Sequence, residues 1–148
     1  MWQSSLEDEL AGYLGVELVP TLSALIDTLI PPDEFPGGWD SGVGGYFALG
    51  FGRQFASHVD LYNTCLAALD TDAQVRQGKP FAELDLPART RFLQELEQEG
   101  IRDGWPESPR QFVRTAAEHA AEGYYSDPGN GGNANGISWK MIGFEVKG

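Results

Sequence analysis

A run of apolar residues spaced alternately by four and three positions is the strongest constraint on how this chain can fold. The run consists of Phe55, Val59, Tyr62, Leu66 and Leu69. This spacing places every member on one face of an α-helix, and that face must be buried against other elements. The run ends at residues 70–72, which read Asp-Thr-Asp, and we expect a separate short helix over residues 73–76.

Four further segments carry helix signals. An acidic first turn follows Ser5, and Pro20 suits the first turn of a second helix whose apolar stripe includes Leu22 and Leu29. A third helix begins at Pro87. The last begins with a Ser-Pro-Arg-Gln capping box over residues 108–111.

Glycine is concentrated in residues 42–52, although the apolar residues of this segment also have helical spacing. Val43, Phe47 and Phe51 are four residues apart, and five glycines lie among them or beside them. A glycine in a helix interior costs up to about 1 kcal/mol relative to alanine. The segment is therefore predicted to form either a weak helix or one against which another backbone packs closely.

These signals predict an all-α fold, a small irregular domain of five to seven helices with an extended Gly/Asn-rich C-terminal segment. A length of 148 residues suits one domain with one core, which we assign to residues 1–148. No alternation of strands with helices suggests a dinucleotide-binding fold. No run is apolar enough to span a bilayer, so direct membrane insertion is not expected.

The chain is strongly acidic, with a formal net charge of −12. Eight acidic residues and no Lys or Arg precede Arg53. Such a surface excludes a nucleic-acid partner and disfavours an anionic membrane surface. Two interpretations stay open: a solvated, solubilising face, or an electrostatic footprint for a basic patch on a partner protein.

Few residues could support nucleophilic catalysis. The single cysteine, Cys65, excludes an intrachain disulfide, and it lies two helical turns, about 10 Å, from His58. The second histidine, His119, lies on an apolar helix face with Phe112 and Ala116. A core histidine with a hydrogen-bond partner is favoured there, and a hydrolase using His119 is kept as an alternative. We expect no catalytic residues on this chain.

The C-terminal segment has a different character from the rest of the chain. Residues 129–136 contain only Gly, Asn and Ala, and the tail that follows is rich in apolar residues. The side-chain oxygens of four residues could bind calcium, but their spacing does not fit an EF-hand, and Asx-turns are favoured. These residues are Asp127, Asn130, Asn133 and Asn135. We expect no metal site. A free-standing carbohydrate- or calcium-binding module built on this loop is the alternative function.

Three sequence elements within residues 123–148 occur in the order of a known family signature. They are Gly123-Tyr124-Tyr125-Ser126-Asp127-Pro128, then Gly131-Gly132-Asn133, then residues 136–144 with the sequence Gly-Ile-Ser-Trp-Lys-Met-Ile-Gly-Phe. The string resembles the C-terminal signature of the gluconate 2-dehydrogenase subunit 3 family. Weaker similarity extends over residues 25–46 and over Phe81 with the helix around Phe92.

The resemblance implies a small, non-catalytic subunit of a sugar dehydrogenase complex acting on glucosides, glucose or gluconate. The partner would be a large FAD-dependent subunit of the glucose–methanol–choline type, often joined by a cytochrome subunit. FAD is expected on that partner, with no cofactor on this chain. The small subunit would support folding, stability or export of its partner in the periplasm. No twin-arginine segment precedes Leu6, and a cytoplasmic location is expected if Met1 is the natural start.

Contact with the partner is expected to involve mainly the C-terminal segment. Trp139 and Phe144 are the expected anchors, because buried aromatic side chains dominate interface energies. Alternatively, these aromatic residues close the domain's own core. The full set of predicted interface residues is Tyr124, Tyr125, Asp127, Asn130, Asn133, Trp139, Phe144 and Trp105.

Overall fold

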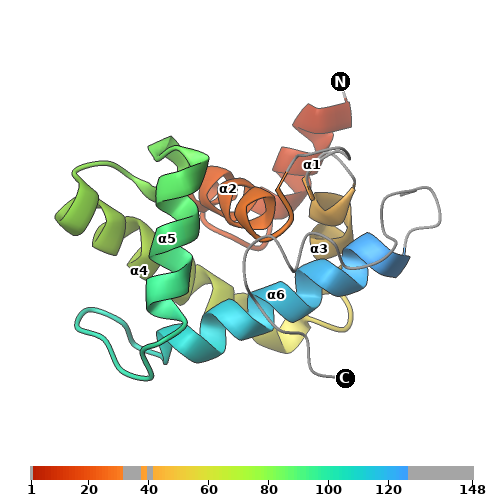
Figure 1. Cartoon of the computed structure of the whole chain (residues 1–148). Helices are drawn as coiled ribbons and strands as arrows, with labels where there is room; N and C mark the ends of the chain where they lie inside the picture. Colours follow the sequence, from red (N-terminus) through yellow and green to blue (C-terminus); the bar gives the residue numbers. More distant parts are fainter. Residues whose placement is uncertain (1, 32–37, 40–41, 127–148) are drawn as a thin grey trace.

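The computed structural model describes residues 2–31, 38–39 and 42–126, which form six α-helices, three short 3₁₀ turns and no strand. This part of the chain confirms the all-α prediction; the predicted extended segment lies outside it. Figure 1 shows the arrangement of the helices. Their bounds are α1 (Trp2–Ala11), α2 (Val19–Leu29), α3 (Val43–Phe51), α4 (Val59–Gln77), α5 (Leu86–Leu96) and α6 (Pro109–Ser126), with 3₁₀ turns at Val16–Leu18, Ala56–His58 and Phe81–Glu83.

Helix α2 is the centre of the fold and contacts each of the other five helices. In Figure 1 it lies in the middle of the molecule, between α5 and α1. Its predicted apolar stripe is confirmed, because Leu22, Leu25, Ile26 and Leu29 are fully buried. Pro20 lies in the first turn, where its missing N–H leaves no helical hydrogen bond unmade.

The predicted break after Leu69 is wrong, because α4 runs without interruption from Val59 to Gln77. Helix α4 ends instead at Gly78, which has the left-handed φ of 81° common after helices. Aspartate is disfavoured in helix interiors because its side chain competes for the hydrogen bonds of nearby backbone groups. Distant partners hold the two carboxylates of this stretch: Asp70 accepts hydrogen bonds from Thr21 and the Phe81 backbone, and Asp72 binds Arg102.

The glycine-rich segment forms helix α3, and two of its glycines are required by packing within the chain. A Cβ atom on Gly44 would lie 2.8 Å from the ring of Trp39, and one on Gly50 would collide with the ring of Phe55. The second interpretation, a helix against which another backbone packs closely, is therefore right only about the close packing, because the groups pressed against Gly44 and Gly50 are aromatic side chains.

A buried ion cluster joins α4, α5 and the loop before α6. The side chain of Arg102 is 3% exposed, and its Nε donates to Asp72 at 2.6 Å. Its other nitrogens contact Glu99 at 2.8 Å and Glu95 at 3.3 Å. Burial acts to raise the pKa of Asp72, but hydrogen bonds from Arg102 and Trp105 outweigh this and hold the pKa below its ordinary 3.8. Asp72 is therefore an anion at neutral pH.

Helices α5 and α6 match their predictions. Phe92, Leu93 and Leu96 of α5 are buried, and Asp85 caps the helix by accepting from the backbone N–H of Ala88. Ser108 caps α6 in the same way, accepting from the Gln111 backbone. In the part of the chain that the structure describes, no helix has the length and apolarity needed to cross a bilayer.

Replacing Arg102 with Met should destabilise the fold by about 3 kcal/mol, because the buried carboxylate of Asp72 loses its main counter-charge. The matched change Arg76→Met removes a half-exposed partner of the same carboxylate and should cost less than about 1 kcal/mol. Urea denaturation of both variants at pH 7 measures the two free energies. Equal losses would show that Arg102 is not the principal partner of Asp72.

Candidate functional site

The structure places only part of the predicted partner interface. Tyr124 and Trp105 have described side chains, while Tyr125 is described only as part of the α6 backbone. The five remaining predicted residues lie outside the described part of the chain and stay predictions. They are Asp127, Asn130, Asn133, Trp139 and Phe144.

The two described aromatic residues take part in the chain's own packing. Tyr124 is 4% exposed and belongs to the hydrophobic core. Trp105 is half-buried; its indole N–H donates to Asp72 at 2.9 Å, and its ring centre lies 6.2 Å from that of Phe112. The structure thus does not bring Trp105 and Tyr124 together as one exposed aromatic surface.

His119 is a core histidine with a hydrogen-bond partner, as its position on an apolar helix face predicts. Its Nδ1 lies 2.8 Å from the hydroxyl of Tyr62, and its ring stacks on Phe55 with centroids 3.9 Å apart. Burial, and secondarily the charge of the nearby His58, lowers the pKa of His119 to about 4. The imidazole is therefore neutral at physiological pH and packs as an aromatic ring.

The other candidate nucleophiles are also buried. Cys65 is completely covered, and burial raises the pKa of its thiol to about 11. Burial likewise raises the pKa of Tyr62 well above 10. Neither group ionises near neutral pH, so neither is activated for attack. Within the described ranges, no three His, Cys, Asp or Glu side chains gather closely enough to hold a metal ion.

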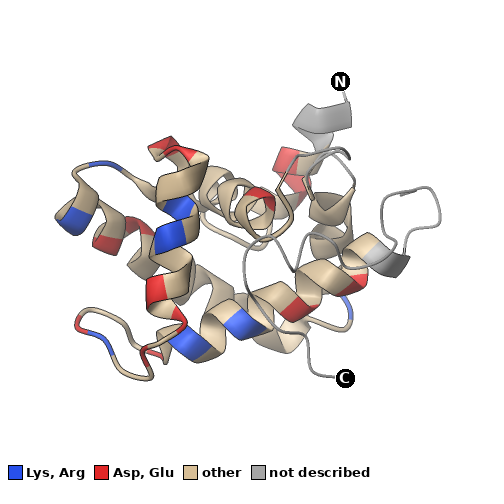
Figure 2. Cartoon of the chain, viewed as in Figure 1, with Lys and Arg blue, Asp and Glu red and all other residues tan. Residues whose placement is uncertain are grey.

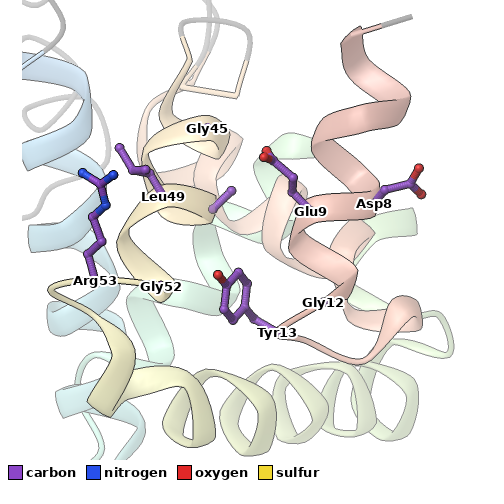
Figure 3. Close-up of a pocket in the computed structure, with 9 residues that line it drawn as sticks. Asp8, Glu9, Gly12, Tyr13, Gly45, Leu49, Gly52 and Arg53 are labelled. Atoms are coloured by element: carbon purple, nitrogen blue, oxygen red, sulfur yellow. The ribbon is translucent and has the colours of Figure 1, made fainter.

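A groove of about 780 Å³ lies between α1 and α3, and no sequence pattern predicted it. In Figure 3, Glu9 and Tyr13 extend from the α1 side, and Leu49 and Arg53 stand on the opposite wall. The lining residues are Asp8, Glu9, Gly12, Tyr13, Gly45, Ala48, Leu49, Gly52 and Arg53. We name this feature the α1/α3 groove.

The charges around the α1/α3 groove are unbalanced. Helix α1 carries three exposed acids, Glu7, Asp8 and Glu9, and no base. Where Figure 2 colours α1 and α3, neither helix carries a basic position, and Arg53 lies two residues after the end of α3. Among the described residues, Asp8, Glu9 and Arg53 make none of the ion pairs. Within that part of the chain, these three charges therefore have no ion-pair partner.

The composition contained a signal for the α1/α3 groove. The acidic residues before Arg53 and the excess of glycine in residues 42–52 both contribute to its lining. Neither feature shows from the sequence alone that α1 packs beside α3. The two helices are more than thirty residues apart in the sequence, and only the tertiary structure shows that they are in contact.

Residues 17–147 match the family model described as Gluconate 2-dehydrogenase subunit 3. The chain therefore belongs to this family, which confirms the resemblance seen in its C-terminal residues. The family's name describes a subunit of a dehydrogenase complex. The match includes α3 and begins after α1, so the two walls of the α1/α3 groove fall on either side of its boundary. No curated protein and no solved structure matches the chain.

Acid should destabilise this fold through His119. The unfolded chain protonates this residue near pH 6.5, whereas the folded chain does so only near pH 4, so unfolding takes up a proton between those values. Stability is complete above about pH 6.5 and falls as the pH drops toward 4, with a slope of at most about 1.4 kcal/mol per pH unit.

The variant His119→Gln has no titrating group at this position and should give a flatter curve between pH 6.5 and 5. Urea denaturation of the wild type and the variant at pH 7, 6 and 5 measures both slopes. A variant slope as steep as that of the wild type would assign the acid sensitivity to another group.

Proposed function

We propose that this chain is the non-catalytic small subunit of an FAD-dependent sugar dehydrogenase complex. The observation that carries the proposal is the family match over residues 17–147. The FAD and the catalytic residues would lie on a large partner of the glucose–methanol–choline type, and a cytochrome subunit would complete the complex. The substrates of the complex would be glucosides, glucose or gluconate, and its location the periplasm.

The chemistry of the described residues supports a role exercised through contact. The two buried candidate nucleophiles of the chain, Cys65 and Tyr62, are held in their protonated forms. Its buried histidine, His119, is engaged by Tyr62 and Phe55 inside the core. These side chains stabilise the domain, and none of them forms a base–nucleophile pair at a surface open to substrate.

The charge supports the same proposal. A net charge of −12 on a chain of this size gives a long-range field that attracts a basic surface and accelerates association. Such a subunit would bind its partner during or after synthesis and stabilise the partner's folded form by mass action. This linkage is sufficient to explain support of folding, stability or export without any catalytic group on the small subunit.

Co-expression with the FAD-dependent dehydrogenase subunit of the same cell tests the proposal. A tagged form of this chain should recover a flavin-containing complex that oxidises a sugar with an added electron acceptor. The isolated chain should be inactive in the same assay. Sugar oxidation by the isolated chain, or its failure to bind the dehydrogenase subunit, would contradict the proposal.

Trp139→Ala separates the two roles open to the C-terminal aromatic residues. As an interface anchor, Trp139 should account for about 2 kcal/mol of binding, so the variant should bind the dehydrogenase subunit about thirtyfold more weakly. The melting temperature of the isolated chain should remain unchanged. A lower melting temperature with unchanged affinity would instead place Trp139 in the domain's own core. Isothermal titration calorimetry and circular dichroism provide the two readouts.

A further inference from the structure

We propose that the α1/α3 groove receives a basic, amphipathic helix of the dehydrogenase subunit. This would be a second contact surface, separate from the C-terminal segment. The inference rests on the proposed function and adds to it the place and chemistry of an interface. It is argued from the shape of the groove, its uncovered apolar side chains and its charge.

The first observation is a glycine that packing among the described residues does not require. Gly45 lies inside α3 and is exposed, and a Cβ atom built on it would meet no other atom within 4 Å. The neighbouring Gly44 and Gly50 are each pressed against an aromatic ring. A glycine in a helix lowers the stability of the helix by about 1 kcal/mol relative to alanine, and at Gly45 no close neighbour accounts for that cost. At the α1/α3 groove it allows another molecule's backbone to come close to α3.

The second observation is apolar surface beside that glycine. Leu49 lies one helical turn after Gly45 and is 54% exposed. Tyr13, across the α1/α3 groove, is 39% exposed, with its ring centre 5.9 Å from that of Phe51. Together with Ala48, these side chains give the α1/α3 groove an apolar lining beneath its charged rim. A partner helix would cover this lining with its own apolar face.

The third observation is the rim charge, which selects the occupant. Asp8 and Glu9 line the groove on the α1 side and Arg53 lines the opposite wall, and none of the three belongs to an ion pair within the described residues. The lining thus carries two acidic side chains and one basic one, and α1 adds the exposed Glu7. A basic residue beside the apolar face of the partner helix would meet the carboxylate of Glu9, which extends toward α3 in Figure 3. A second copy of this chain is a poor occupant, because each copy carries a net charge of −12 and an acidic α1.

Two changes test the α1/α3 groove in the full-length chain, with the co-expressed dehydrogenase subunit as the probe. Gly45→Leu places a side chain where the partner backbone would lie and should weaken binding at least tenfold. Because space is open at Gly45, the isolated variant should melt at the same temperature as the wild type or higher. This combination, weaker binding without loss of stability, distinguishes an interface from a folding defect.

Charge reversal provides the second test. The double variant Asp8→Lys with Glu9→Lys should weaken binding at least tenfold at low salt and reduce the salt dependence of the dissociation constant. The matched control is Asp103→Lys with Glu107→Lys. It makes the same change in net charge on the exposed loop before α6, which Figure 2 shows on the opposite side of the molecule from α1. The control variant should lose less than threefold in affinity for the dehydrogenase subunit.

The outcomes separate this inference from the proposed function. If the wild-type chain does not bind the dehydrogenase subunit, the proposed function is overturned, and this inference with it. If the wild type binds and both groove variants bind as tightly as the control, the proposed function stands and the α1/α3 groove is not the interface. Size-exclusion chromatography adds a third outcome: a wild-type dimer that the groove variants abolish would assign the groove to a second copy of this chain.

Discussion

Burial of helix α2 is the constraint on which the rest of the structure depends. A helix as apolar as Val19–Leu29 must be covered on nearly all sides, and the other five helices together provide that cover. Their positions around α2 then determine what remains outside. Helix α3 turns Val43, Phe47 and Phe51 inward, which leaves Gly45 and Leu49 on its outer face. The α1/α3 groove is therefore a consequence of how the core is filled.

Much of the fold could be predicted because it depends on local signals. The apolar stripes of α2 and α3 and the cap of α6 at Ser108 are all visible in the sequence. The continuity of α4 could not be predicted, because the carboxylate of Asp72 is held there by Arg102 and Trp105, which lie thirty or more residues later in the chain. The same limit applies to the candidate site. The glycine excess around Gly45 pointed to close packing, but no sequence pattern could show which helix lies beside it.

The side chains that might have carried chemistry are used to hold the domain together. His119 is hydrogen-bonded to Tyr62 inside the core, where burial, and secondarily the charge of His58, keeps it neutral. Burial also keeps the thiol of Cys65 protonated. The surface of the described residues instead presents exposed acidic side chains on α1 and exposed apolar area on α3. Together with membership of a dehydrogenase subunit family, this distribution supports a protein that acts by binding.

Hydrogen exchange, followed by mass spectrometry with and without the dehydrogenase subunit, tests this account most directly. It predicts that binding slows exchange in α1, in residues 42–53 and in residues 137–147. Exchange in α5 should stay unchanged, because this helix carries no residue of either proposed surface. Unchanged exchange along the whole chain in the presence of saturating dehydrogenase subunit would contradict the claim that this protein works through contact.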